Sequence, residues 1–216
     1  ETDRIRLDCD DPLRQAIKIR NPLSLDMSIM RTTLIPSLLD NAQRNRNHRV
    51  EGVQLFEVSK VFIRTADAQL PNEVERVSAI ITGSLGSGFY SDPYRPADFF
   101  DIKGVVEGLL DCCGNLDYTM PGTHNPTFHP GRNAEVCVKG QRIGILGEGH
   151  PDVLEDYDLP YKAYLFELDF DVLVKVANFT TRVEPISAYP SVNRDLAIVL
   201  DADIPCLLYT SPSPRD

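Results

Sequence analysis

The sequence predicts an α+β fold built on an antiparallel sheet with flanking helices. Three observations support this fold class. Apolar and polar residues alternate in several runs of strand length, and two longer segments carry apolar residues at helical spacing. Strands and helices also do not alternate regularly, as they do around a parallel sheet. We therefore expect neighbouring strands to pair antiparallel.

The first elements lie in the N-terminal quarter of the chain. Two short strands are expected at 4–8 and 15–21, on either side of an Asp-Asp-Pro turn. A helix is expected at about 33–47, where Pro36 is tolerable because it falls in the first turn. The apolar stripe of this helix consists of Leu34, Ile35, Leu38, Leu39 and Ala42. Positive charge gathers at its C-terminal end, where it meets the carbonyl end of the helix dipole.

Two β-rich runs follow, at 52–63 and 75–83, and a polar loop joins them. The next segment, 84–97, is rich in Gly and Pro and has no periodicity. Loops of this length are usually functional or mobile. The clearest helix of the sequence is expected at 98–114, with Asp98 as its N-cap and Gly114 at its end.

The rest of the sheet is expected near the end of this region. Residues 134–149 read as a hairpin that turns around Gly140, followed by a short helix at 151–159 and a strand at 163–170. The pattern then resets through two prolines, and a new strand begins after residue 190.

Composition and charge limit the classes of function. The 216 residues are 42% hydrophobic and 25% charged, which is typical of a globular protein with a buried core. No apolar run is long enough to span a membrane and the N-terminal segment is acidic, so we expect a cytoplasmic protein without a signal peptide. The net charge of −10 argues against non-specific attraction to nucleic acid, because phosphate binding depends on Lys and Arg. Five cysteines without a Cys-x-x-Cys pair are expected to be reduced thiols: Cys9, Cys112, Cys113, Cys137 and Cys206.

Several motifs have a structural interpretation that outweighs a catalytic one. The histidines at 124, 129 and 150 sit among prolines and glycines, a poor setting for a metal site. The Gly-rich segments 83–88 and 144–149 lack the spacing of a phosphate-binding loop and favour close backbone approach. Acid pairs such as Asp98 and Asp101 are expected to cap elements, and Ser24 has no nucleophile elbow around it.

Six motifs follow one another along the chain: NPLSLDMSIMRTTLIPSLL, LFEVSKVF, DFFDIKGVVEGLL, HPGRNAEV, GQRIGILGEGHP and PSVNRDLAIVL. Their order and spacing resemble those of the beta subunit of bacterial phenylalanyl-tRNA synthetase. The resemblance runs from about residue 4 to about residue 204.

The resemblance implies three parts of the chain. Residues 1–185 would form a module related in fold to class II synthetase active-site domains but catalytically inactive. Residues 186–204 would begin a ferredoxin-like anticodon-binding domain that is cut after one strand. Residues 205–216 match nothing in the family and are expected to be unstructured. The alpha subunit would carry the reaction, within an assembly of two alpha and two beta subunits.

The residues themselves support the inactive interpretation. A working class II site holds the adenylate phosphate with fixed arginines. Here the counterpart of the second class II motif contains Glu57 and Lys60 without the expected Phe-Arg-x-Glu. The Gly-rich, Arg-bearing motif is replaced by a strand with Glu167, Asp169 and Asp171, which would repel ATP phosphates. We therefore expect no catalytic, cofactor or metal residue in this segment, and ATP, magnesium and phenylalanine tRNA would be bound only by the whole enzyme.

Ten residues are predicted to have structural or interface roles. The segment 21–31 is expected to form a strand-loop-helix joint, with its Met and Ile side chains packed and Arg31 bonded to a carboxylate or backbone carbonyl. The alternative for this segment is a direct contact with the alpha subunit. Two alternatives remain open at this point: a diverged ATP-using ligase, and a free-standing RNA-binding or protein-interaction module supported only by RNRNHR. The ten residues are Asn21, Pro22, Ser24, Asp26, Met30, Arg31, Asp101, His129, Pro130 and Gly131.

Overall fold

The computed structural model describes residues 2–24, 28–65, 70–114, 116–180 and 199. The chain divides into two compact units, Glu1–Thr180 and Thr181–Asp216. All helices and strands of the described residues belong to the first unit. The strand expected after residue 190 and the tail expected at 205–216 lie outside the described residues, apart from Val199. The boundary at residue 185 stays a prediction.

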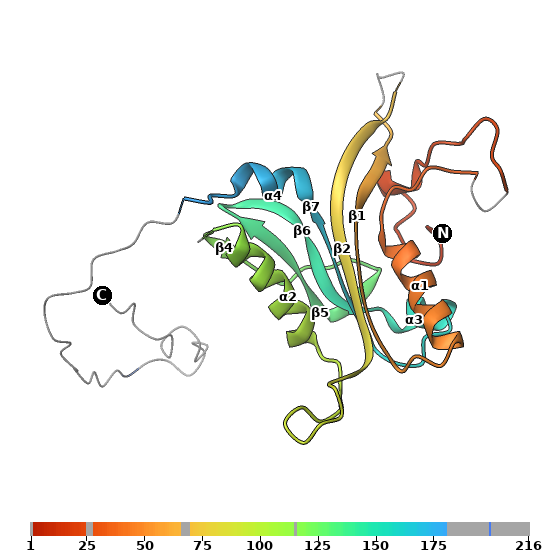
Figure 1. The fold of residues 1–216 in the computed structure, drawn as a ribbon. Coiled ribbons are helices and arrows are strands. Elements are labelled where there is room, and N and C mark those ends of the chain that lie inside the picture. Colours follow the sequence, from red (N-terminus) through yellow and green to blue (C-terminus); the bar gives the residue numbers. More distant parts are fainter. Residues whose placement is uncertain (1, 25–27, 66–69, 115, 181–198, 200–216) are drawn as a thin grey trace, which may run out of the picture. The chain divides into compact units, whose positions relative to one another are not determined.

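An antiparallel sheet of seven strands forms the centre of the first unit, counted over the described residues (Figure 1). Its order is β1-β2-β7-β6-β5-β4, and the short β3 pairs with β2 beside this path. The α+β prediction is therefore confirmed. The bounds are β1 Gly52–Ile63, β2 Asn72–Leu85, β3 Arg95–Pro96, β4 Tyr118–Thr119, β5 Phe128–Val138, β6 Gln141–Gly149 and β7 Ala163–Asp169.

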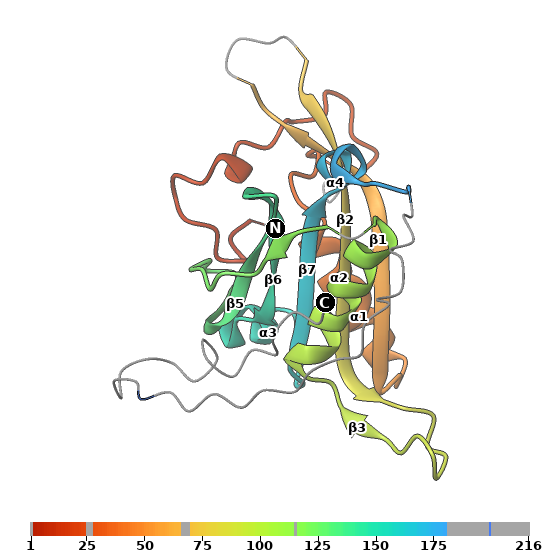
Figure 2. The same cartoon turned by 90° about the vertical axis from the view of Figure 1, so that its left-hand side faces the viewer.

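Helices cover both faces of this sheet, as Figures 1 and 2 show. The helices α1 (Ile35–Asn47) and α3 (Pro151–Asp156) contribute to the apolar core on one face. The helices α2 (Phe99–Cys112) and α4 (Phe170–Val176) contribute to the core on the other. A single 3-10 turn, η1 (Pro12–Arg14), lies in the N-terminal segment.

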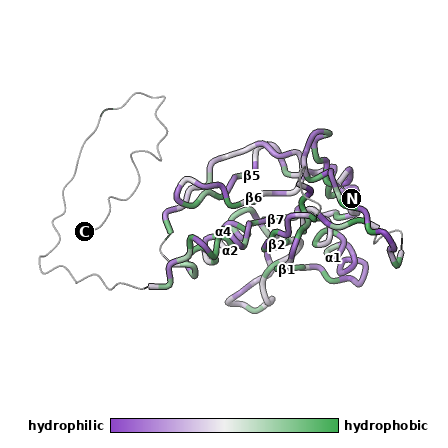
Figure 3. Tube along the Cα trace, turned by 90° about the horizontal axis from the view of Figure 1, so that it is seen from above, coloured by the Kyte–Doolittle hydropathy of each residue, from purple (hydrophilic) through white to green (hydrophobic). Residues whose placement is uncertain are grey.

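The central strand β7 separates the two cores. Ala163 and Leu165 belong to the α1 side, whereas Tyr164, Phe166 and Leu168 belong to the α2 side. Because successive strand residues point to opposite faces, a strand buried on both sides must be apolar nearly throughout. Figure 3 shows the trace of the described residues coloured by hydropathy. The α1 side of the sheet is the one that carries the polar network described below.

The two longer helix predictions are confirmed closely, whereas the helix expected at 151–159 ends at Asp156. The helix expected at 33–47 runs from Ile35 to Asn47 with Pro36 in its first turn. The helix expected at 98–114 runs from Phe99 to Cys112, and its Asp98 accepts from the backbone N–H groups of Phe100 and Asp101. The hairpin of β5 and β6 turns through Lys139 and Gly140, both with positive φ, as a tight right-twisted hairpin requires.

The two N-terminal strand predictions are wrong. Residues 4–6 form turns and Arg6 has a φ of 57°, so the backbone is not extended there. Ile5 and Leu7 are nevertheless buried in the α1-side core, which explains their alternation without a strand. In 15–21 only Lys18 makes a bridge, to Ile29.

Three elements were not predicted from the sequence. The loop expected at 84–97 begins with the end of β2 and returns as β3. The strand β4 and the helix α4 were not expected. Asp169 closes β7 and caps α4, since its carboxylate accepts from the Val172 N–H at 3.0 Å. The strand predicted at 163–170 therefore ends at Asp169, one residue before its predicted end.

In the part of the chain that the structure describes, no helix is long and apolar enough to cross a membrane.

Candidate functional site

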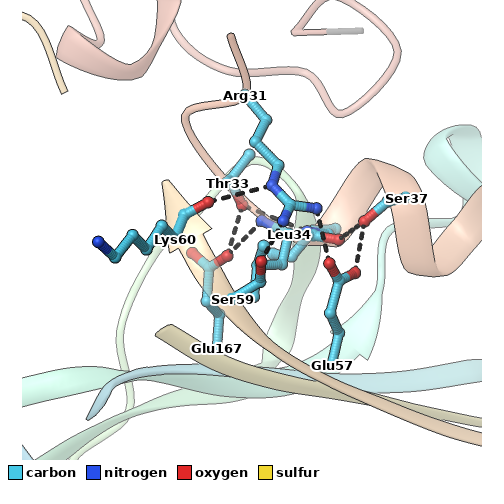
Figure 4. A network of polar contacts seen from close by, with 9 residues as sticks. Arg31, Thr33, Leu34, Ser37, Glu57, Ser59, Lys60 and Glu167 are labelled. Atoms are coloured by element: carbon cyan, nitrogen blue, oxygen red, sulfur yellow. Dashed lines mark hydrogen bonds and ion pairs between the residues drawn. The ribbon is translucent and has the colours of Figure 1, made fainter. Parts of the chain in front are cut away.

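The start of α1 is joined to β7 by a buried carboxylate. Glu167 is only 7% exposed. One of its oxygens accepts from the Thr33 hydroxyl at 2.8 Å and from the Leu34 N–H at 2.6 Å. The Thr33 hydroxyl in turn accepts from the Ile35 N–H at 3.3 Å. Figure 4 shows Glu167, Thr33 and Leu34 meeting at this point. Negative charge is favoured here because the first amides of a helix lack partners within the helix.

The second oxygen of Glu167 pairs with Arg76 of β2. Arg76 and Glu167 lie diagonally across the β2–β7 pair, since Arg76 is opposite Asp169 and Ser78 is opposite Glu167. A buried carboxylate is costly unless it is paired and fully hydrogen-bonded. Here the helix start and the guanidinium together provide that compensation.

Arg31 forms a second network beside the first (Figure 4). Its Nη1 donates to Glu57 Oε1 at 2.6 Å, its Nε donates to the Lys60 carbonyl at 3.1 Å, and its Nη2 donates to the Ser59 hydroxyl. The predicted bond of Arg31 to a carboxylate or a carbonyl is thus confirmed in both forms. Ser37 of α1 also donates to Glu57, at 3.1 Å. Arg31 therefore ties the chain before α1 to the outermost strand β1.

A cavity of about 410 Å³ adjoins the Glu167 network on the α1 side of the sheet. Its polar lining includes Thr33, Arg76, Asn125, Arg142 and Glu167. Its apolar lining comes from the N-terminal segment and from β6, and includes Ile5, Leu7, Leu13 and Ile145.

The charged groups at this cavity already have partners within the chain. Arg76 pairs with Glu167, and the Arg142 Nε lies 2.9 Å from Glu135 Oε1. Asp11 accepts from the Leu13 N–H and caps η1. A charged ligand would have to compete with these intramolecular bonds.

The predicted residues before α1 do not gather at one site. Asn21, Pro22 and Ser24 are exposed, and Asp26 lies outside the described residues. Met30 is half-buried, so it is packed only in part, and Met27 lies outside the described residues. Among the described residues of 21–31, only Arg31 belongs to the network.

Asp101 supports the start of α2. Its carboxylate accepts from the Asp98 N–H at 2.8 Å and from Arg95 Nη1 at 2.8 Å, so it completes a capping box with Asp98. The Arg95 guanidinium holds the pKa of the Asp101 carboxyl below its usual range, and the Asp98 amide acts in the same direction. The expectation that this acid pair caps an element is confirmed.

His129, Pro130 and Gly131 lie in β5, within an irregularity of its pairing with β6 between Phe128 and Asn133. The His129 carbonyl accepts from the Asn133 side-chain amide at 2.7 Å, and its Nδ1 accepts from the Gly131 N–H at 3.2 Å. These hydrogen bonds join residues that are close in the sequence. They hold His129, Pro130 and Gly131 in the strand without the help of a ligand.

The neighbouring Arg132 is a residue that the sequence analysis missed. Its Nη1 lies 3.0 Å and 2.9 Å from the two oxygens of Glu148, which is 5% exposed. Lys162 approaches the same carboxylate at 3.4 Å. Glu148 stands in the Gly-rich run of β6, but nothing in the sequence pairs it with an arginine on another strand.

His150 has a structural role. His150 caps α3, accepting from the Asp152 N–H at 3.2 Å. Burial lowers the pKa of His150, and the nearby Arg6 lowers it further. Over the described residues, no group of three His, Cys, Asp or Glu side chains is placed to hold a metal ion. Cys9, Cys112, Cys113 and Cys137 are free thiols, and Cys206 lies outside the described residues.

The glycines of β6 allow close backbone approach, as expected. A Cβ on Gly144 would lie 2.8 Å from the Leu168 Cα and still closer to the Glu167 carbonyl. Real side chains do not approach a backbone this closely. Position 144 of β6 must therefore be glycine if β6 is to pair with β7.

Comparison with known proteins identifies the family. Residues 1–170 match the family model described as "Phenylalanyl tRNA synthetase beta chain CLM domain". The chain is 39% identical over 202 residues to the phenylalanine–tRNA ligase beta subunit of Symbiobacterium thermophilum, covering 94% of this chain and 23% of that protein. It is 37% identical to the beta subunit of Clostridium acetobutylicum over 204 residues, or 94% and 24% of the two chains. For the beta subunit of Syntrophotalea carbinolica the identity is 39% over 204 residues, or 94% and 25%.

The chain thus spans about a quarter of the length of these curated relatives. The family match covers the N-terminal segment, the sheet and the helices up to the first residue of α4. The chain belongs to the phenylalanyl-tRNA synthetase beta chain CLM domain family.

Proposed function

We propose that this segment is a non-catalytic, structural module of a phenylalanine–tRNA ligase beta subunit, which supports the alpha subunit in an assembly of two alpha and two beta chains. The whole enzyme would attach phenylalanine to its tRNA with ATP and magnesium. The segment would hold neither cofactor. A seven-stranded antiparallel sheet with helices on both faces supports its relation to class II synthetase domains.

One observation carries the non-catalytic part of this proposal. The Glu167 carboxylate occupies the start of α1 and neutralises Arg76, so the chain's own anion takes the place where an anionic ligand would be favoured. A nucleotide phosphate brought to this point would have to displace Glu167 both from the helix start and from Arg76.

The other charged residues at the cavity also do not suit a triphosphate. Asp11, Asp169 and Glu167 border it together with only two arginines, Arg76 and Arg142. Both arginines are already paired with glutamates. A phosphate clamp requires cations whose charge is not already used within the chain.

The supporting role follows from how the networks connect distant segments. Arg31 joins the chain before α1 to β1, and Glu167 joins the helix start to the centre of the sheet. A satisfied polar network of this kind fixes one arrangement of the elements around it. A rigid frame of this type suits a subunit that positions a neighbour's active site.

Calorimetric titration of the purified chain with ATP and magnesium tests the non-catalytic part. We expect no binding heat at micromolar to millimolar nucleotide. Micromolar binding that is lost when Arg76 is replaced by Met would instead favour the alternative of a diverged ATP-using ligase.

Co-expression with an alpha subunit tests the assembly part. A full-length beta subunit carrying Glu167→Gln is expected to give less heterotetramer on size-exclusion chromatography than the wild type. The tetramer that does form should keep its KM for ATP in aminoacylation, because Glu167 would not touch the nucleotide. A changed KM for ATP with normal assembly would contradict the proposal.

The RNA-binding alternative rests on the arginines at the end of α1. One of them, Arg46, donates to the Asp158 carbonyl and so has a structural partner. Charge reversal at Arg44 and Arg49 is expected to leave the tRNA affinity of the assembled enzyme unchanged. A clear loss of affinity would restore the RNA-binding interpretation.

A further inference from the structure

The segment between β2 and β3 forms an ordered arm with an aromatic tip. The arm comprises residues 86–94, and its base is closed by the pairs of Ser84 with Pro96 and Leu85 with Arg95. In Figures 1 and 2 the connection between β2 and β3 extends beyond the end of the sheet. The family assignment and the proposed function leave this segment without a role.

Hydrogen bonds within the arm give it a defined shape. The Gly88 N–H donates to the Asp92 carbonyl at 3.1 Å, and the Asp92 N–H donates to the Phe89 carbonyl at 2.9 Å. The Asp92 carboxylate accepts from the Ser87 N–H at 2.8 Å. Hydrogen bonds from Ser87 hold the pKa of the Asp92 carboxyl below its usual range.

Glycines and the adjoining helix fix the arm further. Gly86 and Gly88 have φ values of 102° and 76°, a region that other residues rarely adopt. A Cβ on Gly88 would lie 2.6 Å from the Tyr94 ring, so this ring lies against the glycine backbone. At the base, Arg95 pairs with Asp101 of the α2 capping box. The arm is therefore anchored to the folded unit.

Three aromatic side chains of the arm are exposed to solvent, two of them at its tip (Phe89 and Tyr90). Phe89 is 72% exposed, Tyr90 105% and Tyr94 70%. An isolated exposed aromatic is ordinary, but three on one ordered arm form the kind of cluster that anchors protein–protein contacts. Aromatic side chains dominate such contacts because they bury a large area with few rotatable bonds.

The charge of the arm excludes nucleic acid as the preferred partner. Asp92 is the only charged residue in 86–94, so the tip offers no Lys or Arg to a phosphate. The same lack of positive charge disfavours an anionic membrane surface. A protein surface with an apolar pocket and a neutral or basic rim is complementary to this tip.

We infer that the arm docks its aromatic tip into an apolar pocket on the part of the beta subunit that lies outside this chain. The relatives are about four times as long as the matched region, so about three quarters of such a subunit is not represented here. A covalently connected surface is present at high effective concentration, which favours an intramolecular contact over a separate partner. Besides the geometry of the arm, this inference needs only family membership and does not depend on the proposed assembly role.

Photo-crosslinking in the holoenzyme tests the inference. The full-length beta subunit is made with Tyr90→p-benzoylphenylalanine, assembled with the alpha subunit and tRNA, and irradiated. We expect the dominant product to be a crosslink within the beta subunit, from position 90 to a peptide outside this region, identified by mass spectrometry. A dominant crosslink to the alpha subunit or to tRNA, or the absence of a specific product, would overturn the inference. Leu70→p-benzoylphenylalanine is the matched control, because Leu70 is 79% exposed in the β1–β2 connection.

Chymotrypsin gives a second readout that needs no substitution. The protease cleaves after aromatic residues, and its rate follows the population in which the site is accessible. Cleavage at Phe89 and Tyr90 is expected to be at least about tenfold slower in the full-length subunit than in this 216-residue chain. Tyr161, which is 54% exposed, serves as the reference site. Equal rates at the arm in both proteins would overturn the inference, whether or not the alpha subunit assembles normally.

Discussion

Glu167 on β7 and Thr33 before α1 are 134 residues apart in the sequence and are joined by a 2.8 Å hydrogen bond in the interior. This bond places a carboxylate at the start of α1, where the Leu34 amide also reaches it. The start of α1, which covers one face of the sheet, is thereby tied to the central strand β7. The stability of the module should depend on this contact more than on any surface ion pair.

Glu167→Gln tests this dependence. The amide keeps the volume of the side chain but removes the charge that compensates Arg76, which is only 21% exposed at its side chain. Leaving one member of a buried pair uncompensated costs several kcal/mol. We expect the free energy of unfolding to fall by roughly 2–4 kcal/mol in urea denaturation at pH 7.

Glu73→Gln is the matched control. Glu73 pairs with Lys60 at 2.8 Å on the surface, with both side chains about half exposed. Solvent screens such a pair, so no measurable change is expected. If the two substitutions cost the same, the Glu167 network does not have the importance assigned to it.

Arg31→Lys tests the geometry of the second network. Lysine keeps the charge but cannot direct a planar group at Glu57, Ser59 and the Lys60 carbonyl together. We expect a loss of about 1–2 kcal/mol in the unfolding free energy of the purified chain. Unchanged stability of the chain, combined with weaker assembly with the alpha subunit, would favour a direct intersubunit contact of Arg31.

A pair of Gly→Ala substitutions tests the close approach of β6 and β7. In Gly144→Ala the new methyl group would overlap the β7 backbone near Leu168, and overpacking of this kind costs about 1–3 kcal/mol or more. In Gly104→Ala the methyl group meets nothing within 4 Å on α2. Alanine there should stabilise the chain by about 0.5–1 kcal/mol, because it favours the helix. Thermal unfolding of the two variants should move in opposite directions.

The lowered pKa of Asp101 predicts that its contribution to the stability of α2 depends on pH. Because the pKa of Asp101 is lower in the folded chain than its ordinary 3.8, its contribution is fully present above that value. The contribution falls as the pH drops from 3.8 through the folded pKa. Asp101→Asn should cost about 1 kcal/mol at pH 7. This cost should shrink in urea titrations as the pH is lowered below 3.8, and a cost that is constant with pH would contradict the assignment.

The sequence predicted the helices and the antiparallel hairpins where one segment contains the whole signal. The helix α2 carries its own N-cap, its apolar stripe and its terminating glycine, so Asp98 and Gly114 mark its ends closely. The β5–β6 turn is similarly local, because Lys139 and Gly140 provide the two positive φ values. Such elements need no knowledge of the rest of the chain.

The N-terminal segment shows why alternation alone misleads. Ile5 and Leu7 alternate with charged residues as in a half-buried strand, yet they reach the core from a chain of turns. Burial, and not backbone pairing, sets their spacing. The pairing of Glu167 with Thr33 could likewise not be predicted, because it depends on how α1 packs on the sheet. The pairing of Arg132 with Glu148 depends on the register of the β5–β6 hairpin, which shifts between Val136 and Cys137.

The burial of β7 on both faces limits how members of this family can vary in length. Deletion of a single residue within Ala163–Leu168 would exchange the two sets of side chains, turning the carboxylate toward the α2-side core and aromatic rings toward the start of α1. Neither environment could accommodate the exchange. Insertions and deletions among homologues should therefore concentrate in connections such as 64–71, while the length of this strand stays constant.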